Sequence, residues 1–250
     1  MKFKKASSDF ESFIQEIEPP NNDDYLSFIF QFSKEHYTAR VEMAGFRGGR
    51  KVLDAGCGYG QWALALSGYN KYVIGIDRNQ HMIKISNRLM KKFNVINTDF
   101  RVGILPDLEF DDEEFDYIWC WSVFMFVERE KTLKEFYRVL KPGGRLLVGC
   151  CNSVGRWLYK CFNSLNPSHL DMHTLRYSMN ALLKGHRDDI APHYSTLRSV
   201  KKSCEKNGFE LIASGFDGYI DLSGRERKLP MFPERFLGFE QNIEFICKKI

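Results

Sequence analysis

The chain has 250 residues, of which 44% are hydrophobic and 27% charged, and its formal net charge is +4. This composition is ordinary for a globular protein, and the length suits one large domain. The first residues are basic, but no apolar run follows them, and no stretch approaches the roughly 20 apolar residues of a membrane span. We therefore expect neither a signal peptide nor a membrane segment, and a cytoplasmic location.

The distribution of cysteines and basic residues disfavours a disulfide-bonded protein and a nucleic-acid-binding protein. The 7 cysteines form neither C-x-x-C pairs nor an even framework, so we interpret them as reduced thiols. The basic residues occur as scattered pairs rather than as a concentrated stripe, which disfavours nucleic acid as a partner. The oligomeric state is left open.

An N-terminal helical cap is predicted over residues 1–45. Its first helix begins near residue 9, and the run Pro19-Pro20-Asn21-Asn22-Asp23 breaks it. A second helix is expected from about residue 24 to residue 44.

Residues 52–60 read Val-Leu-Asp-Ala-Gly-Cys-Gly-Tyr-Gly, a short apolar strand that ends in an acid and alternating glycines. Gly56, Gly58 and Gly60 let the backbone turn and approach a ligand, and the N-H groups of the helix that follows favour a carboxylate-bearing ligand. Dinucleotide folds need the spacing G-x-G-x-x-G instead. Asp54 would repel a pyrophosphate but suits a cationic amine.

This stretch resembles motif I of the class I S-adenosylmethionine-dependent methyltransferases. The resemblance implies their Rossmann-like fold and their cofactor, S-adenosyl-L-methionine, which leaves as S-adenosyl-L-homocysteine. Asp77 ends a predicted strand over residues 72–76 and would accept the ribose hydroxyls, unless it merely caps the next helix. Arg78 and Met82 would lie beside the adenine. A strand over residues 94–98 would end in the adenine-reading pair Asp99-Phe100, unless Asp99 is a plain loop acid.

Two later stretches resemble the small-molecule, methyltransferase type 11-like members. Residues 114–121 are similar to their fourth strand, where the chain reaches the methyl group, and this places Cys120 at the cofactor. Residues 136–148 are similar to their helix, turn and fifth strand. Leu-Lys-Pro-Gly-Gly is a helix stop, because Pro142 cannot continue a helix and the glycines permit a left-handed turn. The resemblance covers about residues 51–150.

Strands that alternate with helices predict an α/β fold with a doubly wound sheet. The family has seven strands, mostly parallel, with an antiparallel last strand, expected here over residues 242–249. We expect a single methyltransferase domain. Its parts are the cap (1–45), the cofactor-binding core (46–150), a substrate-side insertion (151–195) and the C-terminal part of the sheet (196–250), which holds a helix at 197–207 and a strand at 208–214.

The insertion is rich in aromatic and titratable side chains, and we expect it to determine the substrate. A predicted helix over residues 168–183 places His169 and His173 four residues apart on one face. A metal site needs a third ligand, and none stands at diagnostic spacing, so no metal is predicted. The two histidines are candidate general bases, with surface or packing histidines as the alternative.

Many relatives carry a histidine pair after the fourth strand, and here those positions are Met125 and Phe126. The apolar run at 124–127 is either a wall of the site or core packing. We predict in-line methyl transfer to a small-molecule acceptor, with oxygen slightly preferred over nitrogen or carbon. The alternatives are an RNA or protein acceptor, and a regulatory or scaffold protein that binds the cofactor without turnover. A Rossmann oxidoreductase is disfavoured by the glycine spacing.

Overall fold

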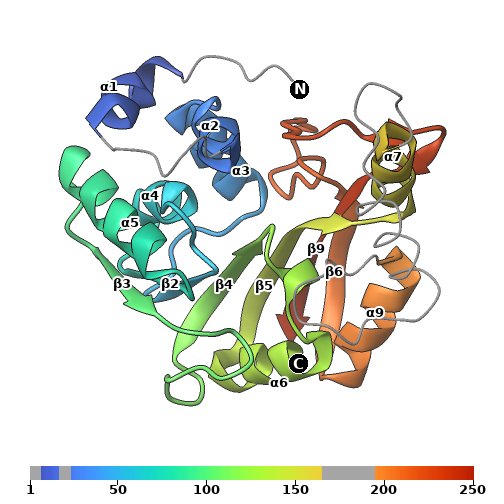
Figure 1. Cartoon of the computed structure of the whole chain (residues 1–250). Helices are drawn as coiled ribbons and strands as arrows, with labels where there is room; N and C mark the ends of the chain where they lie inside the picture. Colours follow the sequence, from blue (N-terminus) through green and yellow to red (C-terminus); the bar gives the residue numbers. More distant parts are fainter. Residues whose placement is uncertain (1–6, 17–23, 165–194) are drawn as a thin grey trace.

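The computed structural model describes residues 7–16, 24–164 and 195–250, and its centre is a seven-stranded sheet (Figure 1). The strand order is β3-β2-β1-β4-β5-β9-β6. All neighbours are parallel except the two pairs made by β9, which confirms the predicted fold class and the antiparallel last strand. The strands are β1 (Val52–Ala55), β2 (Val73–Asp77), β3 (Thr98–Val102), β4 (Phe115–Trp121), β5 (Leu140–Asn152), β6 (Phe209–Phe216) and β9 (Asn242–Lys249).

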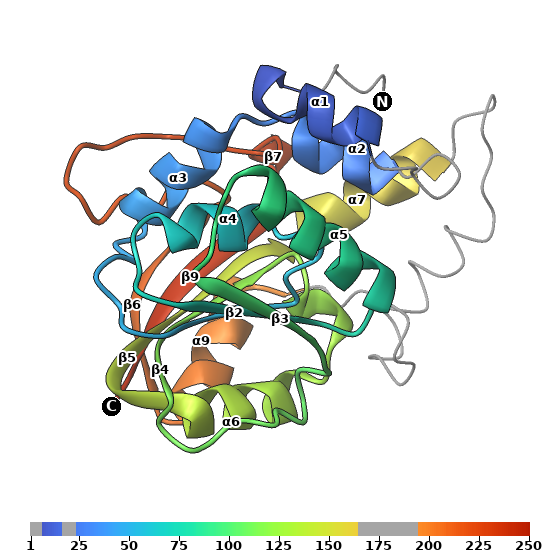
Figure 2. The ribbon, with the colours of Figure 1, turned by 90° about the vertical axis from the view of Figure 1, so that its left-hand side faces the viewer.

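Helices cover both faces of the sheet. Figure 2 shows α4 (Gln61–Ser67) and α5 (Gln80–Lys92) on one face, and α6 (Arg129–Val139) and α9 (Leu197–Lys206) on the other. Alternate strand residues point to opposite faces and enter two separate apolar clusters. Val52 belongs to the cluster on the α4 side, whereas Leu53 belongs to the cluster on the α6 side.

The predicted helix stop is confirmed. Helix α6 ends at Val139 and β5 begins at Leu140, with the proline and glycine turn forming the irregular start of the strand. Gly143 has a φ of 74°, which is left-handed. The turn therefore converts a helix into a strand without an intervening loop.

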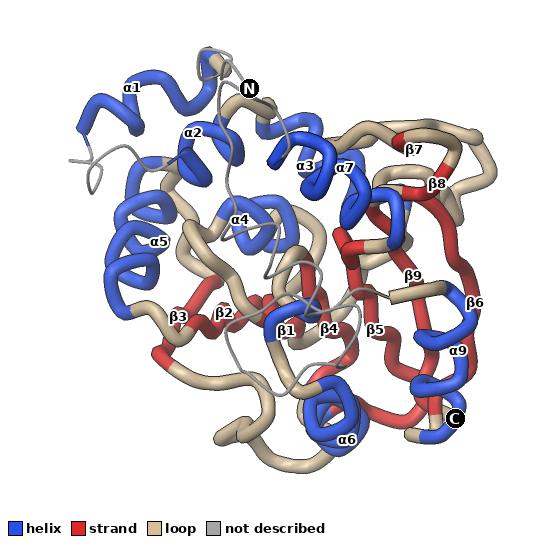
Figure 3. The backbone as a smooth tube through the Cα atoms, turned by 45° about the vertical axis from the view of Figure 1, so that its right-hand side comes forward, coloured by secondary structure: helices blue, strands red, loops and turns tan. Residues whose placement is uncertain are grey.

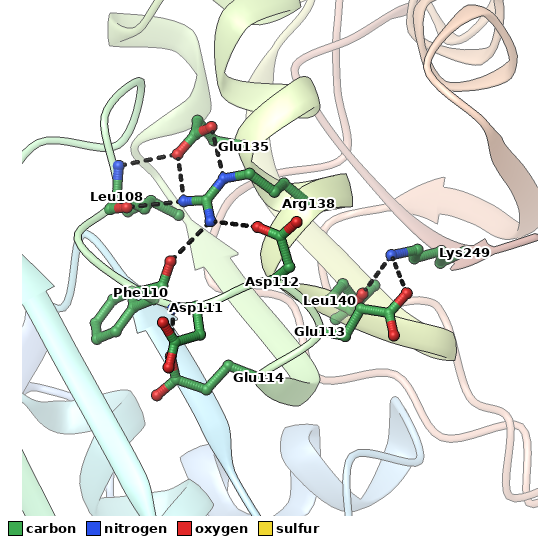
Figure 4. Close-up of polar contacts among 10 residues, drawn as sticks. All are labelled: Leu108, Phe110, Asp111, Asp112, Glu113, Glu114, Glu135, Arg138, Leu140 and Lys249. Carbon is green, nitrogen blue, oxygen red and sulfur yellow. Dashed lines mark hydrogen bonds and ion pairs between the residues drawn. The ribbon is translucent and has the colours of Figure 1, made fainter.

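The connection from β3 to β4 is fastened to α6 by Arg138 (Figure 4). Its guanidinium donates to the carbonyl oxygens of Leu108 at 2.8 Å and Phe110 at 2.7 Å, and it pairs with the carboxylates of Asp112 and Glu135. These carboxylates raise the pKa of Arg138. Arg138 thus fixes the loop after β3 to α6, on the face of the sheet that α6 and α9 cover.

The cap differs from its prediction in one respect. It consists of α1 (Ser8–Glu16), α2 (Asp24–Phe30) and α3 (Lys34–Met43), so the expected continuous helix from 24 to 44 is wrong. Ser33 is the reason, because its hydroxyl accepts a hydrogen bond from His36 N at 3.2 Å and starts a new helix as an N-cap. Figure 3 shows the cap on the same side of the sheet as α4.

A buried ion cluster joins the cap to the far half of the sheet. Arg40 of α3 lies 2.9 Å from Asp217 Oδ1 and 2.6 Å from Glu244 Oε2. All three residues are no more than 4% exposed. Asp217 directly follows β6 and Glu244 lies in β9 beside Gly215, so both carboxylates lie near the carboxyl end of β6.

Two elements of the C-terminal half have no counterpart in the prediction. Helix α7 (Val154–Ser164) follows β5, and β7 (Arg235–Phe236) pairs with β8 (Phe239–Glu240) in a small hairpin against which α7 packs. The predicted helix at 168–183, with His169 and His173, lies outside the described residues. No helix in the described ranges is long and apolar enough to cross a membrane.

Replacing Arg40 by alanine should strongly destabilise the protein. Two buried carboxylates would lose their cation, which typically costs about 3 to 5 kcal/mol. Urea unfolding followed by tryptophan fluorescence measures this loss. The control is Lys201→Ala, which removes the exposed ion pair with Glu205. Equal unfolding free energies for the two variants would contradict the anchoring role.

Candidate functional site

The glycine turn between β1 and α4 is packed at both ends and open in the middle. Gly56 has a φ of 78°, and a Cβ there would lie 2.4 Å from the Val123 side chain. Gly60 has a φ of 83°, and its Cβ would lie 3.0 Å from the Ser86 Cβ. A Cβ on Gly58, in contrast, would meet no atom within 4 Å. Protein packing therefore explains the outer glycines, and open space at Gly58 leaves room for a ligand.

Asp54 is the last residue but one of β1, and one of its carboxylate oxygens is unused among the described residues. The residue is 1% exposed, and the Ala63 N-H in the first turn of α4 hydrogen-bonds to its carboxylate. Its Oδ2 is buried and has no partner among the described residues. Burial, with the charge of Asp77 nearby, raises the pKa of Asp54 to about 8. A cationic group against Oδ2 would stabilise the ionised form.

Asp77 ends β2 and holds the glycine turn. Its Oδ2 accepts a hydrogen bond from Gly58 N at 3.0 Å, and its Oδ1 accepts one from Asn79 N at 2.9 Å. The alternative role as a helix cap is wrong, because Asn79 is the N-cap of α5 and accepts from His81 N. Asp77 therefore lies at the carboxyl end of its strand, in contact with the open part of the turn.

The part of the chain that carries Asp54, the glycine turn and Asp77 matches known proteins. The family described as "Methyltransferase domain" matches residues 53–148. The chain is 35% identical over 109 residues to the "Uncharacterized methyltransferase YcgJ" of Bacillus subtilis (strain 168), covering 43% of each chain. It is 36% identical over 129 residues to the demethylmenaquinone methyltransferase of Staphylococcus carnosus (strain TM300), covering 49% of this chain and 53% of that one.

Residues 53–148 belong to the methyltransferase domain family, and the fold is that of the class I S-adenosylmethionine-dependent methyltransferases. Its cofactor is S-adenosylmethionine. The crystal structure of YcgJ from Bacillus subtilis has the same fold, with a TM-score of 0.59 and 20% identity over 87% of this chain and 99% of that one. The chain spans about half the length of the curated relatives it matches.

Arg78 directly follows β2 and Met82 lies in α5, and their place beside the adenine stays a prediction. Arg78 is exposed, and Met82 is partly buried against the core cluster. The Ser86 hydroxyl donates to the carbonyl oxygens of both Met82 and Gly58, so α5 is tied to the glycine turn.

The expected end of β3 is wrong, and this displaces Asp99 and Phe100. The strand covers Thr98–Val102 rather than residues 94–98, so Asp99 lies inside it and pairs with Ile74 near the start of β2. Its carboxylate accepts from Arg101 Nε at 2.8 Å. Phe100 is buried in the core, where a Cβ on Gly75 would lie 2.6 Å from its ring. Val102, and not Asp99, is the residue beside Asp77.

Cys120 lies in β4 and is fully buried, with Val148 as its neighbour in β5. Its side chain belongs to the apolar cluster on the α6 side of the sheet. Burial raises the pKa of its thiol. Only the main chain at this position is therefore suited to meet a ligand at the end of β4. The six described cysteines are free and buried.

The sequence reasoning missed Tyr25, which lies above the glycine turn. Its ring is 6.1 Å from the ring of Tyr59 in that turn. Burial raises the pKa of its hydroxyl, and the nearby charges of Asp77 and Asp54 add to the effect. The residue is 37% exposed. Tyr25 follows a predicted helix break and belongs to no sequence motif. Only the folded structure brings it near the glycine turn.

Tyr37 and Phe124 pack in the core, whereas Phe126 of the same apolar run as Phe124 is exposed. Tyr37 is 1% exposed and donates to Ile29 O at 2.7 Å, so it packs in the core and does not line the open turn. In the apolar run after β4, Phe124 packs on Phe245, and Phe126 is 42% exposed. His169 and His173 stay predictions, since they lie outside the described residues.

Ligand binding should release a proton from Asp54. At pH 7 a carboxyl with a pKa of about 8 is mostly protonated, and it must ionise to face a cationic amine. We expect close to one proton to be released when S-adenosylhomocysteine binds, and affinity to rise with pH until about pH 8. Calorimetry in buffers of different ionisation enthalpy counts the protons.

The matched variants are Asp54→Asn, which should release none, and Asp99→Asn, which should behave like the unaltered protein. Asp99 is the comparison because it is an acid of the same region that is already paired with Arg101. Proton release that is unchanged in Asp54→Asn would refute the assignment.

Proposed function

We propose that this protein transfers the methyl group of S-adenosylmethionine to a small molecule, with oxygen slightly preferred over nitrogen or carbon as the acceptor atom. The observation that carries the proposal is the pair of acids, Asp54 and Asp77, at the ends of adjacent strands around an open glycine turn. The likeness to demethylmenaquinone methyltransferases, whose name describes a small-molecule acceptor, supports the choice of substrate class.

The cofactor's amine and ribose would be held by this pair of acids. We assign the amine to Asp54 Oδ2, because that oxygen is buried and unused among the described residues. We assign the ribose hydroxyls to Asp77. Both of its oxygens already accept backbone N-H groups, but each carboxylate oxygen has a second lone pair for a hydroxyl. Gly58 would let the backbone approach the ligand.

The adenine would lie against the segment that follows β3. Gly103 N donates to Asp77 O at 3.1 Å, which fixes this segment beside the proposed ribose position. Val102 is 57% exposed and Ile104 is 54% exposed, which is unusual for β-branched apolar residues next to a polar site. We propose that these two side chains cover the adenine ring, in place of the earlier prediction of Asp99 and Phe100.

Bound S-adenosylmethionine supplies an electrophilic methyl group on a sulfonium. The chain has to align the acceptor with this group and exclude water. Orientation alone can contribute about 7 to 11 kcal/mol, and a general base typically adds a factor of about 10² to 10⁴. Tyr25 and the cap would close the site above the cofactor. An alcohol acceptor would need a base, and His169 and His173 are our proposed candidates.

A macromolecular acceptor is less consistent with the distribution of charge. A basic hollow of about 400 Å³ lies at the amino ends of the strands, on the edge of the sheet opposite Asp54 and Asp77. A nucleic acid bound there would be remote from the proposed transfer position. The hollow is lined by Arg50, Lys51, Lys71, Tyr72, Glu114 and Lys141.

Removing the Asp77 carboxylate should weaken cofactor binding. Asp77→Ala deletes a charge-assisted hydrogen bond worth about 1.5 to 3 kcal/mol, so we expect affinity for S-adenosylhomocysteine to fall at least tenfold by calorimetry. Asp77→Asn keeps an acceptor oxygen for the turn and should lose less. Tight binding of NAD without a response to S-adenosylmethionine or S-adenosylhomocysteine would overturn the proposed function.

Methyl-labelled S-adenosylmethionine distinguishes the acceptor classes. With a small-molecule extract as the acceptor source, we expect label in the low-molecular-weight fraction and none in RNA or protein. Cofactor binding without transfer of label to any fraction would favour the regulatory alternative.

A further inference from the structure

Arg156 occupies an unusual position on the acceptor side of the sheet. It lies in the first turn of α7, which leaves the carboxyl end of β5. This helix is fixed closely, since a Cβ on Gly155 would lie 2.3 Å from Phe239 O in the small hairpin. The guanidinium carbon of Arg156 is 5.4 Å from the Tyr159 ring centre and 5.3 Å from that of Phe232. The cation is thus held against two aromatic rings.

One aromatic ring connects this cation to the end of β4. Phe232 stacks on Trp121 with ring centres 6.0 Å apart and planes 17° apart, and on Phe28 of the cap at 4.9 Å and 23°. Trp121 is the last residue of β4. Arg156 therefore lies one ring away from the strand end at which methyl transfer is proposed.

The hydrogen-bonding capacity of this guanidinium is unused within the described part of the chain. Arg156 is partly buried, yet no described carboxylate lies within 4 Å of it and no described group accepts its side-chain N-H groups. Buried Arg40 pairs with two carboxylates, and Arg227 pairs with Glu42 and Asp221. Arg156 keeps its planar donor fork available, which matches the two oxygens of a carboxylate.

We propose that Arg156 is a specificity-determining residue that binds a carboxylate on the small-molecule acceptor. This inference rests on the proposed function and refines its substrate class. A single carboxylate balances the single charge of Arg156.

Two naphthalene probes that differ only in a carboxylate test the proposal. The full chain, saturated with S-adenosylhomocysteine, is titrated with 1-hydroxy-2-naphthoate and with 1-naphthol, and affinities are measured by calorimetry. We expect the naphthoate to bind at least tenfold more tightly. In Arg156→Gln the two probes should bind equally, and Arg156→Lys, which keeps the charge but not the fork, should retain part of the preference.

The control variant is Arg235→Gln, because Arg235 is exposed and stacks on Phe216 at 5.2 Å without contacting Trp121 or Phe232 in the described structure. It should keep the full preference for the naphthoate. Equal or undetectable binding of both probes to the unaltered chain overturns the proposal, as does a preference that survives in Arg156→Gln.

Cofactor binding is measured separately in each variant. Unchanged affinity for S-adenosylhomocysteine in Arg156→Gln shows that the variant is folded. If the unaltered chain fails to bind S-adenosylhomocysteine, the proposed function fails, and titration of the probes without it still tests Arg156.

Discussion

Two carboxylates near the ends of neighbouring parallel strands determine the path of the glycine turn and the charge of the site. Pairing of β1 with β2 brings Asp54 opposite Gly75, two residues before Asp77. The glycine turn must then pass over both acids. A hydrogen bond from Gly58 N to Asp77 holds the middle of the turn, while Gly56 packs against Val123 and Gly60 against Ser86. Burial, with the charge of Asp77 nearby, raises the pKa of Asp54 to about 8, and a cationic ligand would stabilise its ionised form.

A second carboxylate couples the cap to the acceptor side. Asp217 pairs with Arg40 of α3, accepts from the Trp121 indole and accepts from Met231 N at 2.8 Å. The group that fastens the cap therefore also positions the end of β4 and the segment that carries Phe232. Movement of the cap would disturb the aromatic stack as well as the cover of Tyr25 above the glycine turn. The proposed donor and acceptor sites therefore depend on the same buried carboxylate, Asp217.

The parts of the structure that could be predicted from sequence are those with local signals. The glycine turn, Asp77 and the helix stop before β5 each depend on neighbouring residues, and the fold confirms where they lie. The end of β3 could not be read in this way. Residues 94–97 look like a buried strand, but Asn94 has a φ of 54° and Ile96 is 93% exposed, so they form the turn before an edge strand. The Arg40 cluster joins residues far apart in the chain and leaves no local pattern.

The contrast between local signals and long-range contacts also explains why the sequence says more about the methyl donor than about the acceptor. The family match ends at residue 148, and the groups that we assign to the donor lie within it, apart from Tyr25. The proposed acceptor site draws on the cap, the end of β4, α7 and the segment after β6, and all of these except the end of β4 lie outside that match. Similarity to relatives over the matched residues therefore supports the choice of cofactor but gives no information about the acceptor. Acceptor chemistry has to be argued from side chains such as Arg156, whose aromatic contacts and unused donors arise only when these distant segments pack together.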